Sequence, residues 1–339
     1  MSYNRRMEVL HAIVSDYVKT REPVASKTLV ERYKFGVSPA TIRNDMVILE
    51  EQGLIHQPHT SAGRVPTDAG YRVFVDQIAE IKPLSSVQRN AISTFLSDAT
   101  DIQDVVERSV KLLAQLTNQV AVVQYPSIRK VNLKHIEMLL LSPNKIMFIF
   151  ITTNGYVSRR VIETTMPVKQ EALDSLKLKL NIACTGVESS QIIISLEDLN
   201  RTLHPNEQHI VQGLKQIILD ILTIDSEEKL VTAGSSNLVK VDDDFNNSIV
   251  PVLDALEEQV VLLRLFSQMN NDKKVEVSIG VENQCEDLLE TSVVAGAYGT
   301  TEAKAHISII GPKRMDYAKN MAAVETVCKH LSEHLSQNG

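Results

Sequence analysis

The sequence has few cysteines, no tryptophan and no long apolar run. Its three cysteines lie far apart in the 339 residues and form no Cys-x-x-Cys pair, so we expect buried, reduced thiols. No window approaches the roughly 18 consecutive apolar residues of a membrane span. The apolar residues after the N-terminal arginine pair are interrupted by Glu8, His11 and Asp16, which argues against a secretory signal. We therefore predict a cytoplasmic protein with no membrane partner.

Catalytic signatures are also missing. There is no phosphate-binding glycine loop, no dinucleotide fingerprint and no HExxH zinc helix. His204 and His209 are five residues apart and do not share one helical face, and the acidic run at 242–244 is more typical of a solvated turn than of a cation site. We expect no metal, no cofactor and no enzymatic activity. An enzyme with an accessory DNA-binding module would need a catalytic constellation in residues 90–339.

An excess of positive charge is absent overall but present locally. The formal net charge is −7. Up to Phe74 the chain has ten basic and eight acidic residues, a net +2 that leaves −9 for the remainder. This asymmetry fits a small DNA-facing module on an acidic body.

The first 75 residues predict three helices and a hairpin. One helix runs from about Asn4 to Thr20, and Ser26 is expected to cap a second that ends near Tyr33. Gly36 suits the next turn because it can adopt a positive φ. The third helix starts with Ser38 at the N-cap and proline at the first helical position, and it ends before Gly53. Two short strands around the loop at 57–67 then complete a winged helix-turn-helix.

The third helix and the hairpin loop, or wing, carry the candidate DNA contacts. In a helix-turn-helix the N-terminal part of the second motif helix enters the major groove, where arginine can read guanine and asparagine can read adenine. The wing offers hydroxyl, imidazole and guanidinium groups for phosphates or the minor groove. The predicted DNA-binding residues are Ser38, Ala40, Thr41, Arg43, Asn44, His59, Thr60, Ser61, Gly63 and Arg64. The alternatives are a structural three-helix bundle and an ordinary polar hairpin. Arg5 and Arg6 are equally compatible with phosphate contacts and with solvated charges.

The remainder alternates between helices and strands. Helical patterns cover 85–97 and 101–118, and β-rich runs follow, including a hairpin around Asn154-Gly155. Helices are expected at 169–182, 195–203 and 207–224, a short strand at 229–234, and one acidic helix over 242–269. Strands return before a final helix at 315–335. This order predicts one α/β domain interrupted by an insertion.

Several segments resemble a known family, the heat-inducible transcription repressors of bacteria (HrcA type). The N-terminal segments are specific to it: EPVASKTLVERY, GVSPATIRNDMVILEEQGLI and PHTSAGRVPTDAGYRVFVD. Looser matches downstream include LLLSPNKIMFIFITTNGYVSRRVIE, VSIGVEN and IGPKRMDYAKNMAAVE. The segment SVVAGAYGTTEAKAHISIIGP follows the pattern with some drift. The likeness extends over the whole chain.

The resemblance implies an α+β multidomain fold with four segments. They are a winged helix-turn-helix domain (1–80), the first part of a GAF-like domain (81–165), an inserted dimerising domain (166–244) and the second part of the GAF-like domain (245–339). It also implies a homodimeric repressor of chaperone operons. Such a dimer binds double-stranded operator DNA with an inverted repeat (CIRCE type) and depends on a GroEL-type chaperonin for activity. The alternative is a ligand-sensing DNA-binding regulator that uses the GAF-like domain as a pocket.

Overall fold

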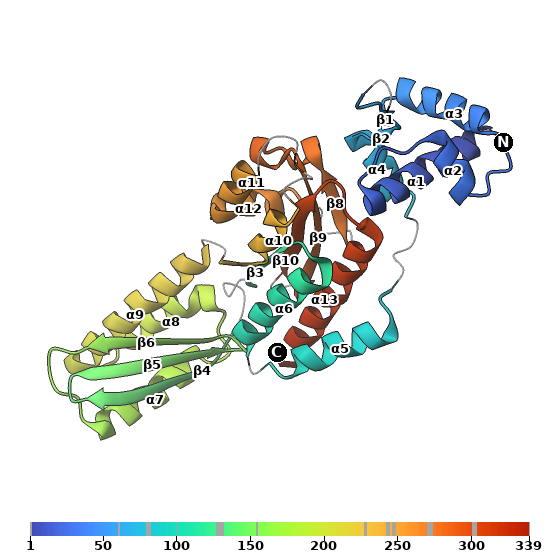
Figure 1. The fold of residues 1–339 in the computed structure, drawn as a ribbon. Helices are drawn as coiled ribbons and strands as arrows, with labels where there is room; N and C mark the ends of the chain where they lie inside the picture. Colours follow the sequence, from blue (N-terminus) through green and yellow to red (C-terminus); the bar gives the residue numbers. More distant parts are fainter. Residues whose placement is uncertain are drawn as a thin grey trace.

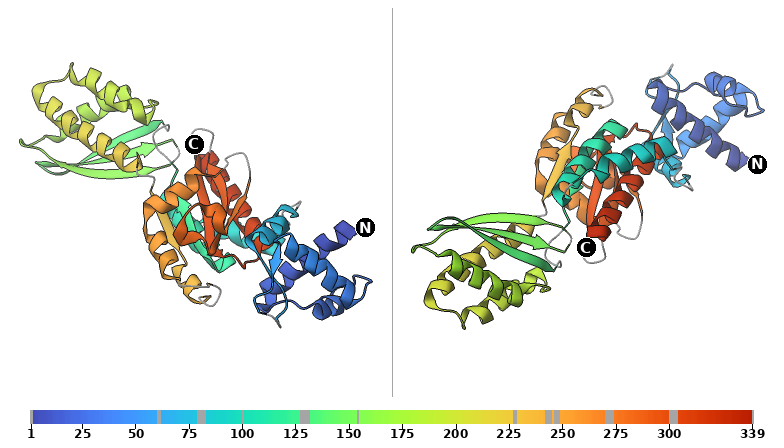
Figure 2. Two further views of the ribbon diagram at one scale, coloured as in Figure 1. Left: turned by 90° about the horizontal axis from the view of Figure 1, so that it is seen from above. Right: turned by 90° about the horizontal axis from the view of Figure 1, so that it is seen from below.

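The computed structural model describes residues 2–59, 62–78, 83–99, 101–126, 132–153, 155–226, 229–241, 245, 249–269, 274–299 and 304–338. It forms an elongated row of three parts (Figures 1 and 2). The winged-helix domain lies at one end, a five-stranded sheet with helices on both faces lies in the middle, and a three-stranded sheet with helices lies at the other end. None of the helices in these ranges is both long and apolar enough to span a bilayer.

The winged-helix domain follows the expected element order. Its helices and strands are α1 (Ser2–Thr20), α2 (Ser26–Arg32), α3 (Pro39–Glu51), β1 (Ile55–His56), β2 (Val65–Pro66) and α4 (Asp68–Asp76). The apolar positions of α1 and α3 converge on a shared core that includes Leu10, Ile13, Ile42 and Leu49. One detail of the prediction was wrong: the N-cap of α2 is Ala25, and Ser26 is buried without capping the helix.

The central sheet is antiparallel, with strand order β7-β3-β10-β9-β8. Its strands are β3 (Val120–Gln124), β7 (Leu230–Ala233), β8 (Glu276–Ile279), β9 (Thr291–Gly299) and β10 (Lys304–Pro312). One face packs against α6 (Ile102–Thr117) and α13 (Tyr317–Asn338), beside which lies α5 (Ser86–Ser97). The other face packs against α10 (Ser235–Val239), α11 (Val250–Glu257) and α12 (Gln259–Ser267). The single helix predicted over 242–269 is divided into α11 and α12 within the described residues 249–269, because Glu258 between them has an extended backbone conformation. Residues 242–244 and 246–248 lie outside the described residues.

Strands β4 (Leu133–Ser142), β5 (Lys145–Thr152) and β6 (Val157–Glu163) form a separate antiparallel sheet. Helices α7 (Gln170–Cys184), α8 (Ile192–Asn200) and α9 (Pro205–Ser226) cover one of its faces, and sheet and helices share a core of their own. We call residues 132–226 the inserted unit, because they lie between the paired strands β3 and β7. The expected boundary at residue 166 falls inside this unit, because β4–β6 pack with α7–α9 and not with the central sheet. The hairpin β5–β6 forms where the sequence predicts it, but Ile151 pairs with Val157, which is one residue out of register with a two-residue turn at Asn154-Gly155. Asn154 itself lies outside the described residues.

The cysteines are free thiols. Cys184 and Cys328 are buried, and Cys285 is half-buried. Burial raises the pKa of Cys184 to about 11 and also raises that of Cys328. These two thiols are therefore protonated and unreactive at neutral pH.

Candidate nucleic-acid interface

The start of α3 is built as the sequence predicts. The Ser38 hydroxyl accepts a hydrogen bond from the Thr41 amide at 3.3 Å, and the two hydroxyl groups lie 3.0 Å apart. Proline occupies the first helical position, where a backbone N–H would have no acceptor within the helix, so its absence costs no hydrogen bond. Gly53 follows the helix with a φ of +72°. The cap fixes where the helix begins and therefore which side chains its first turns present.

Helix α3 separates an inner from an outer face. Its inner face places Ile42, Met46 and Leu49 in the domain core. The outer face presents Ala40, Arg43 and Asn44 to solvent, and Thr41 is half-buried. Both Arg43 and Asn44 are exposed, and among the described residues Arg43 forms no ion pair, so both side chains are accessible to a ligand.

One residue of this outer face was missed by the sequence analysis. Val47 is 41% exposed and lies three and four residues after Asn44 and Arg43, which places all three on adjacent positions of one face. An exposed valine beside these polar groups can contact the methyl group of thymine in a major groove. The signal that could have found it is its position, which is out of phase with the buried residues of α3.

An ion pair with a buried carboxylate holds α3 against α1. Asp45 is 3% exposed, and its carboxylate accepts hydrogen bonds from the Arg5 guanidinium at 2.7 and 3.2 Å. The hydrogen bond to Asp45 raises the pKa of Arg5, although burial opposes it. Arg5 is thus engaged inside the domain, which favours a structural role over the phosphate contact that the sequence left open.

A second buried carboxylate fixes α2. Asp16 of α1 is 4% exposed and accepts hydrogen bonds from Arg32 and from the Tyr33 hydroxyl, each at 2.9 Å. Burial, followed by the hydrogen bond to Asp16, raises the pKa of Tyr33 to about 12. The first helix of the motif is therefore tied to the scaffold just before the turn that leads into α3.

The wing is attached to the segment that precedes α2. Val24 and Arg64 exchange two backbone hydrogen bonds of 2.9 Å, which adds a bridge beside β1 and β2. Gly63 allows this approach, because a Cβ atom there would lie 2.5 Å from the carbonyl group of Val24. His59 is exposed, whereas Thr60 and Ser61 lie outside the described residues. Gly63 therefore has a structural reason to be glycine that the sequence did not reveal.

Arg64 joins the wing to α3 through its side chain. Its guanidinium lies 3.0 and 2.8 Å from the Glu50 carboxylate, and only 18% of the side chain is exposed. A hollow of about 430 Å³ lies between α2, α3 and the wing, and Arg43, Gly63 and Arg64 line it together with Gln57. The structure thus brings three of the predicted residues to one concave surface. The sequence analysis missed Glu50 and Gln57, since neither carries a signal in its spacing.

Comparisons with known proteins support a helix-turn-helix domain at the N-terminus. Residues 11–67 match the family model of the DeoR-like helix-turn-helix domain, and residues 103–321 match that of the HrcA protein C-terminal domain. The heat-inducible transcription repressor HrcA of Beutenbergia cavernae is 47% identical over 349 residues, with 99% of both chains covered. The repressor of the same name from Pseudarthrobacter chlorophenolicus is 48% identical over 336 residues, again with 99% of both chains covered. A crystal structure described only as a hypothetical protein has a TM-score of 0.72 at 25% identity, over 99% of each chain.

Proposed function

The chain belongs to the HrcA family of heat-inducible transcription repressors, and from this membership we propose how it recognises DNA. It is a transcriptional repressor with an N-terminal DNA-binding helix-turn-helix. The observation that supports the docking mode best is the outer face of α3, which begins at a capped first turn and presents exposed polar side chains to solvent.

In the proposed complex α3 enters the major groove. Arg43 donates to guanine and Asn44 pairs with adenine, while Val47 lies against a thymine methyl group. Ser38 and Thr41 contact a phosphate beside the groove. In the wing His59, Thr60 and Ser61 bind the neighbouring phosphates.

Gly63 and Arg64 act mainly by shaping the wing in this proposal. Gly63 admits the backbone of Val24, and the Arg64 side chain is neutralised by Glu50. Both residues therefore support the contacts of the wing from behind.

We further propose a homodimer formed through the uncovered face of the β4–β6 sheet. On β5 the side chains of Met147, Ile149 and Ile151 point away from the buried Ile146, Phe148 and Phe150. Their cross-strand partners on this face include Leu139 (45% exposed), Val157 (43%) and Val161 (51%). An apolar sheet face of this kind is typical of a protein–protein contact.

The charges on this face suit a two-fold contact with a second copy of the chain. Ile149 pairs with Glu137 on one side and Arg159 on the other. A two-fold axis that lies in the interface parallel to β5 brings Glu137 of each protomer opposite Arg159 of the other. An isologous interface of this type is self-complementary. The dimer then carries two copies of α3 for two half-sites of an inverted repeat, which we propose is a CIRCE-type operator of chaperone genes.

The regulatory part of the proposal is a dependence on a GroEL-type chaperonin in the cytoplasm. A chaperonin that favours the active dimer raises its concentration by mass action, and heat-damaged proteins that occupy the chaperonin lower it. Purified dimer is expected to bind the operator more strongly when chaperonin is supplied. Operator binding that is identical with and without chaperonin, in cells and with purified protein, would contradict this part alone.

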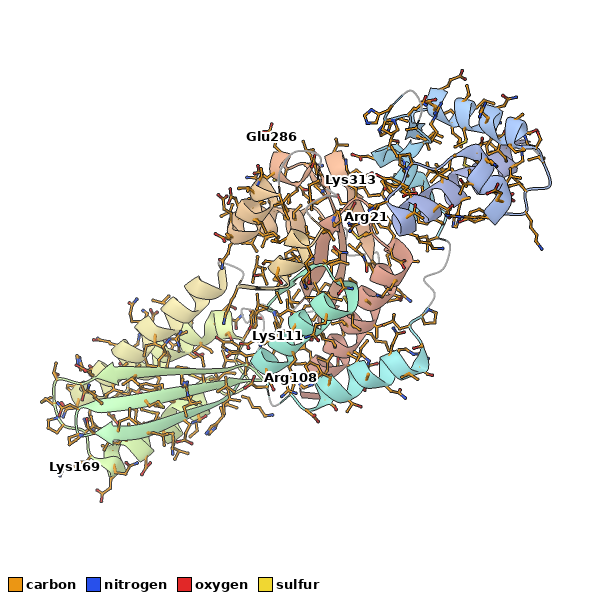
Figure 3. All side chains as sticks on the ribbon, in the orientation of Figure 1. Arg21, Arg108, Lys111, Lys169, Glu286 and Lys313 are labelled. Carbon is orange, nitrogen blue, oxygen red and sulfur yellow. The ribbon has the colours of Figure 1, made fainter. Side chains whose placement is uncertain are left out.

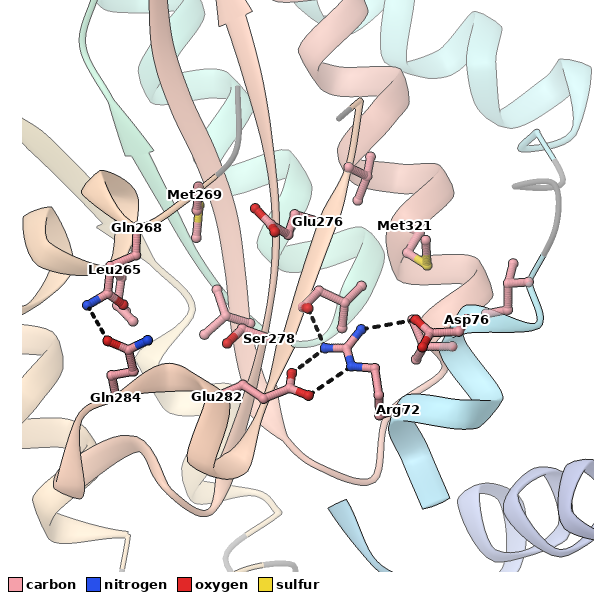
Figure 4. Close-up of a pocket in the computed structure, with 15 residues that line it drawn as sticks. Arg72, Asp76, Leu265, Gln268, Met269, Glu276, Ser278, Glu282, Gln284 and Met321 are labelled. Atoms are coloured by element: carbon pink, nitrogen blue, oxygen red, sulfur yellow. Dashed lines mark hydrogen bonds and ion pairs between the residues drawn. The ribbon is translucent and has the colours of Figure 1, made fainter. Parts of the chain in front are cut away.

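A second candidate, ligand sensing, is supported by one observation. A cavity of about 510 Å³ lies where α4 meets β8, and charged groups including Arg72, Asp76, Glu276 and Glu282 line it (Figure 4). A metabolite bound there would contact both the DNA-binding domain and the body. Metabolites that raise the melting temperature of the purified protein and change operator affinity would support this function.

The proposed DNA contact is tested by Arg43→Ala. We expect operator binding to weaken by about 1–3 kcal/mol, measured by fluorescence anisotropy at fixed salt, with a smaller loss on random duplex. The control is Arg201→Ala, which removes an exposed arginine at the end of α8 in the inserted unit. Equal losses on operator and random DNA would assign Arg43 to a phosphate, and no loss on either would contradict the docking of α3.

A further inference from the structure

Arg72 in α4 links the winged-helix domain to the central sheet and its helices, which we call the body. The Arg72 guanidinium in α4 donates to both oxygens of Glu282, one of them at 2.8 Å, and to the Val277 carbonyl oxygen at 2.6 Å (Figure 4). Glu282 is held in place because it also accepts a hydrogen bond of 2.9 Å from the Ile279 amide. A bidentate arginine–carboxylate pair fixes orientation as well as distance.

The connection between β10 and α13 supplies further contacts. Lys313 forms an ion pair of 2.8 Å with Asp68 at the start of α4, and Arg314 donates to the Val18 carbonyl oxygen in the last turn of α1. The rings of Tyr71 and Tyr317 lie 6.0 Å apart. Figure 3 shows Lys313 where the body meets the winged-helix domain. Lys313, Arg314 and Tyr317 lie in the segment IGPKRMDY (310–317), to which the proposed DNA contacts assign no role.

The contacts reach the winged-helix domain at three separate places: the end of α1, the start of α4 and the middle of α4. Three anchors that are not in line define the orientation of one body relative to another. The apolar core is also continuous here, since buried residues of the winged-helix domain, α6 and α13 belong to one cluster. The recognition helix therefore has a fixed direction relative to the body.

We propose that Arg72, Lys313 and Arg314 are positioning residues that set the half-site spacing that the repressor accepts. The inference rests on the proposed function, in which a dimer binds an inverted repeat. When two binding modules are rigidly linked, the second half-site is bound strongly only if its position matches the linkage. A loose linkage lowers affinity at the matching spacing but tolerates other spacings. Selectivity for half-site spacing therefore depends on residues that do not contact DNA.

The experiment uses the full-length dimer and three duplexes, with a scrambled duplex as the reference. One has the operator spacing, one has a spacer that is longer by about half a helical turn, or about 5 base pairs, and one has a single half-site. The wild type is expected to lose about 10- to 100-fold in affinity on the lengthened spacer. We call the affinity for the operator spacing divided by the affinity for the lengthened spacer the spacing ratio. Arg72→Glu is expected to reduce this ratio to below about threefold and to leave the affinity for the single half-site unchanged. The double variant Arg72→Glu/Glu282→Arg is expected to restore a large part of the ratio.

Two further variants distinguish the proposed effect from misfolding and from a nonspecific change of charge. Arg314→Ala changes the body side of the junction and is expected to lower the ratio without altering the winged-helix domain. Arg108→Glu is the matched control, because Arg108 is similarly exposed (30% against 28% for Arg72) and pairs with Asp104 within α6. It should keep the ratio of the wild type.

The outcomes separate this inference from the proposed function. A wild-type ratio that persists in both Arg72→Glu and Arg314→Ala refutes the positioning role. A loss of single half-site affinity in Arg72→Glu equal to its loss on the operator also refutes it, because the residue then acts on DNA binding itself. If the wild type does not distinguish the inverted repeat from a scrambled duplex, the proposed function has failed first.

Discussion

Replacing Gly63 by alanine should detach the base of the wing. The new Cβ atom would lie 2.5 Å from both C and O of Val24 and 2.6 Å from the Pro23 carbonyl oxygen. All three are backbone atoms that cannot rotate away. The chain must separate there, which breaks the two backbone hydrogen bonds between Val24 and Arg64. At about 1 kcal/mol for each hydrogen bond, with a similar amount for strain, we expect a local destabilisation of about 2–4 kcal/mol.

Hydrogen exchange of the intact protein measures this effect where it occurs. The amides of Val24 and Arg64 should exchange about 30- to 1,000-fold faster in Gly63→Ala, because 1.36 kcal/mol corresponds to a factor of ten. Gly53→Ala is the control: Gly53 has a φ of +72° but no atom within 4 Å of its Cβ position. It should cost only about 1 kcal/mol, through backbone strain at the end of α3. Unchanged protection at both amides in Gly63→Ala would refute the steric argument.

Three other changes test separate parts of the structure. Burial raises the pKa of Glu282, but the hydrogen bonds from Arg72 and the Ile279 amide, together with the charge of Arg72, lower it below its usual value of 4.5. The stabilisation is therefore present above pH 4.5 and is lost as the pH falls through the folded-state pKa. Wild type and Glu282→Gln should accordingly differ in melting temperature at pH 7 and converge in acid. Tyr33→Phe removes the hydrogen bond to Asp16 and should lower the free energy of unfolding by about 1–2 kcal/mol in denaturant titrations, whereas Tyr3→Phe at an exposed site should not. Ile149→Asp should convert the dimer to monomer in sedimentation, and Leu178→Asp on the exposed face of α7 should leave it dimeric.

Local signals explain why the helices of the DNA-binding domain were predicted well. The start of α3 depends on Ser38 and its neighbouring proline, and the end depends on Gly53, all of which act within one turn of the helix. The inner face of α3 follows from apolar spacing. The predicted identity of the domain is confirmed by the match of residues 11–67 to a helix-turn-helix family. The individual DNA contacts remain predictions.

The errors arise where distant parts of the chain decide the outcome. Alternating strands such as β4 and β5 do not reveal which sheet they join, so the hairpin was assigned to the wrong unit. The break between α11 and α12 has no proline or glycine to mark it and depends on packing against the central sheet. The pairing of Arg5 with Asp45 spans 40 residues. A charge near a DNA-binding surface therefore cannot be assigned to phosphate from sequence alone.

The Arg64–Glu50 pair changes how the charge of this domain contributes to affinity. To contact a phosphate, the Arg64 guanidinium would have to leave the Glu50 carboxylate, which lies 2.8 Å away. Only 18% of the Arg64 side chain is exposed. Arg5 is similarly committed to Asp45. The number of counterions released on binding follows the phosphates that are actually neutralised, not the number of basic residues. The salt dependence of operator binding should therefore be shallower than the ten basic residues up to Phe74 suggest, because Arg5 and Arg64 are paired with carboxylates of α3 and hold that helix in place.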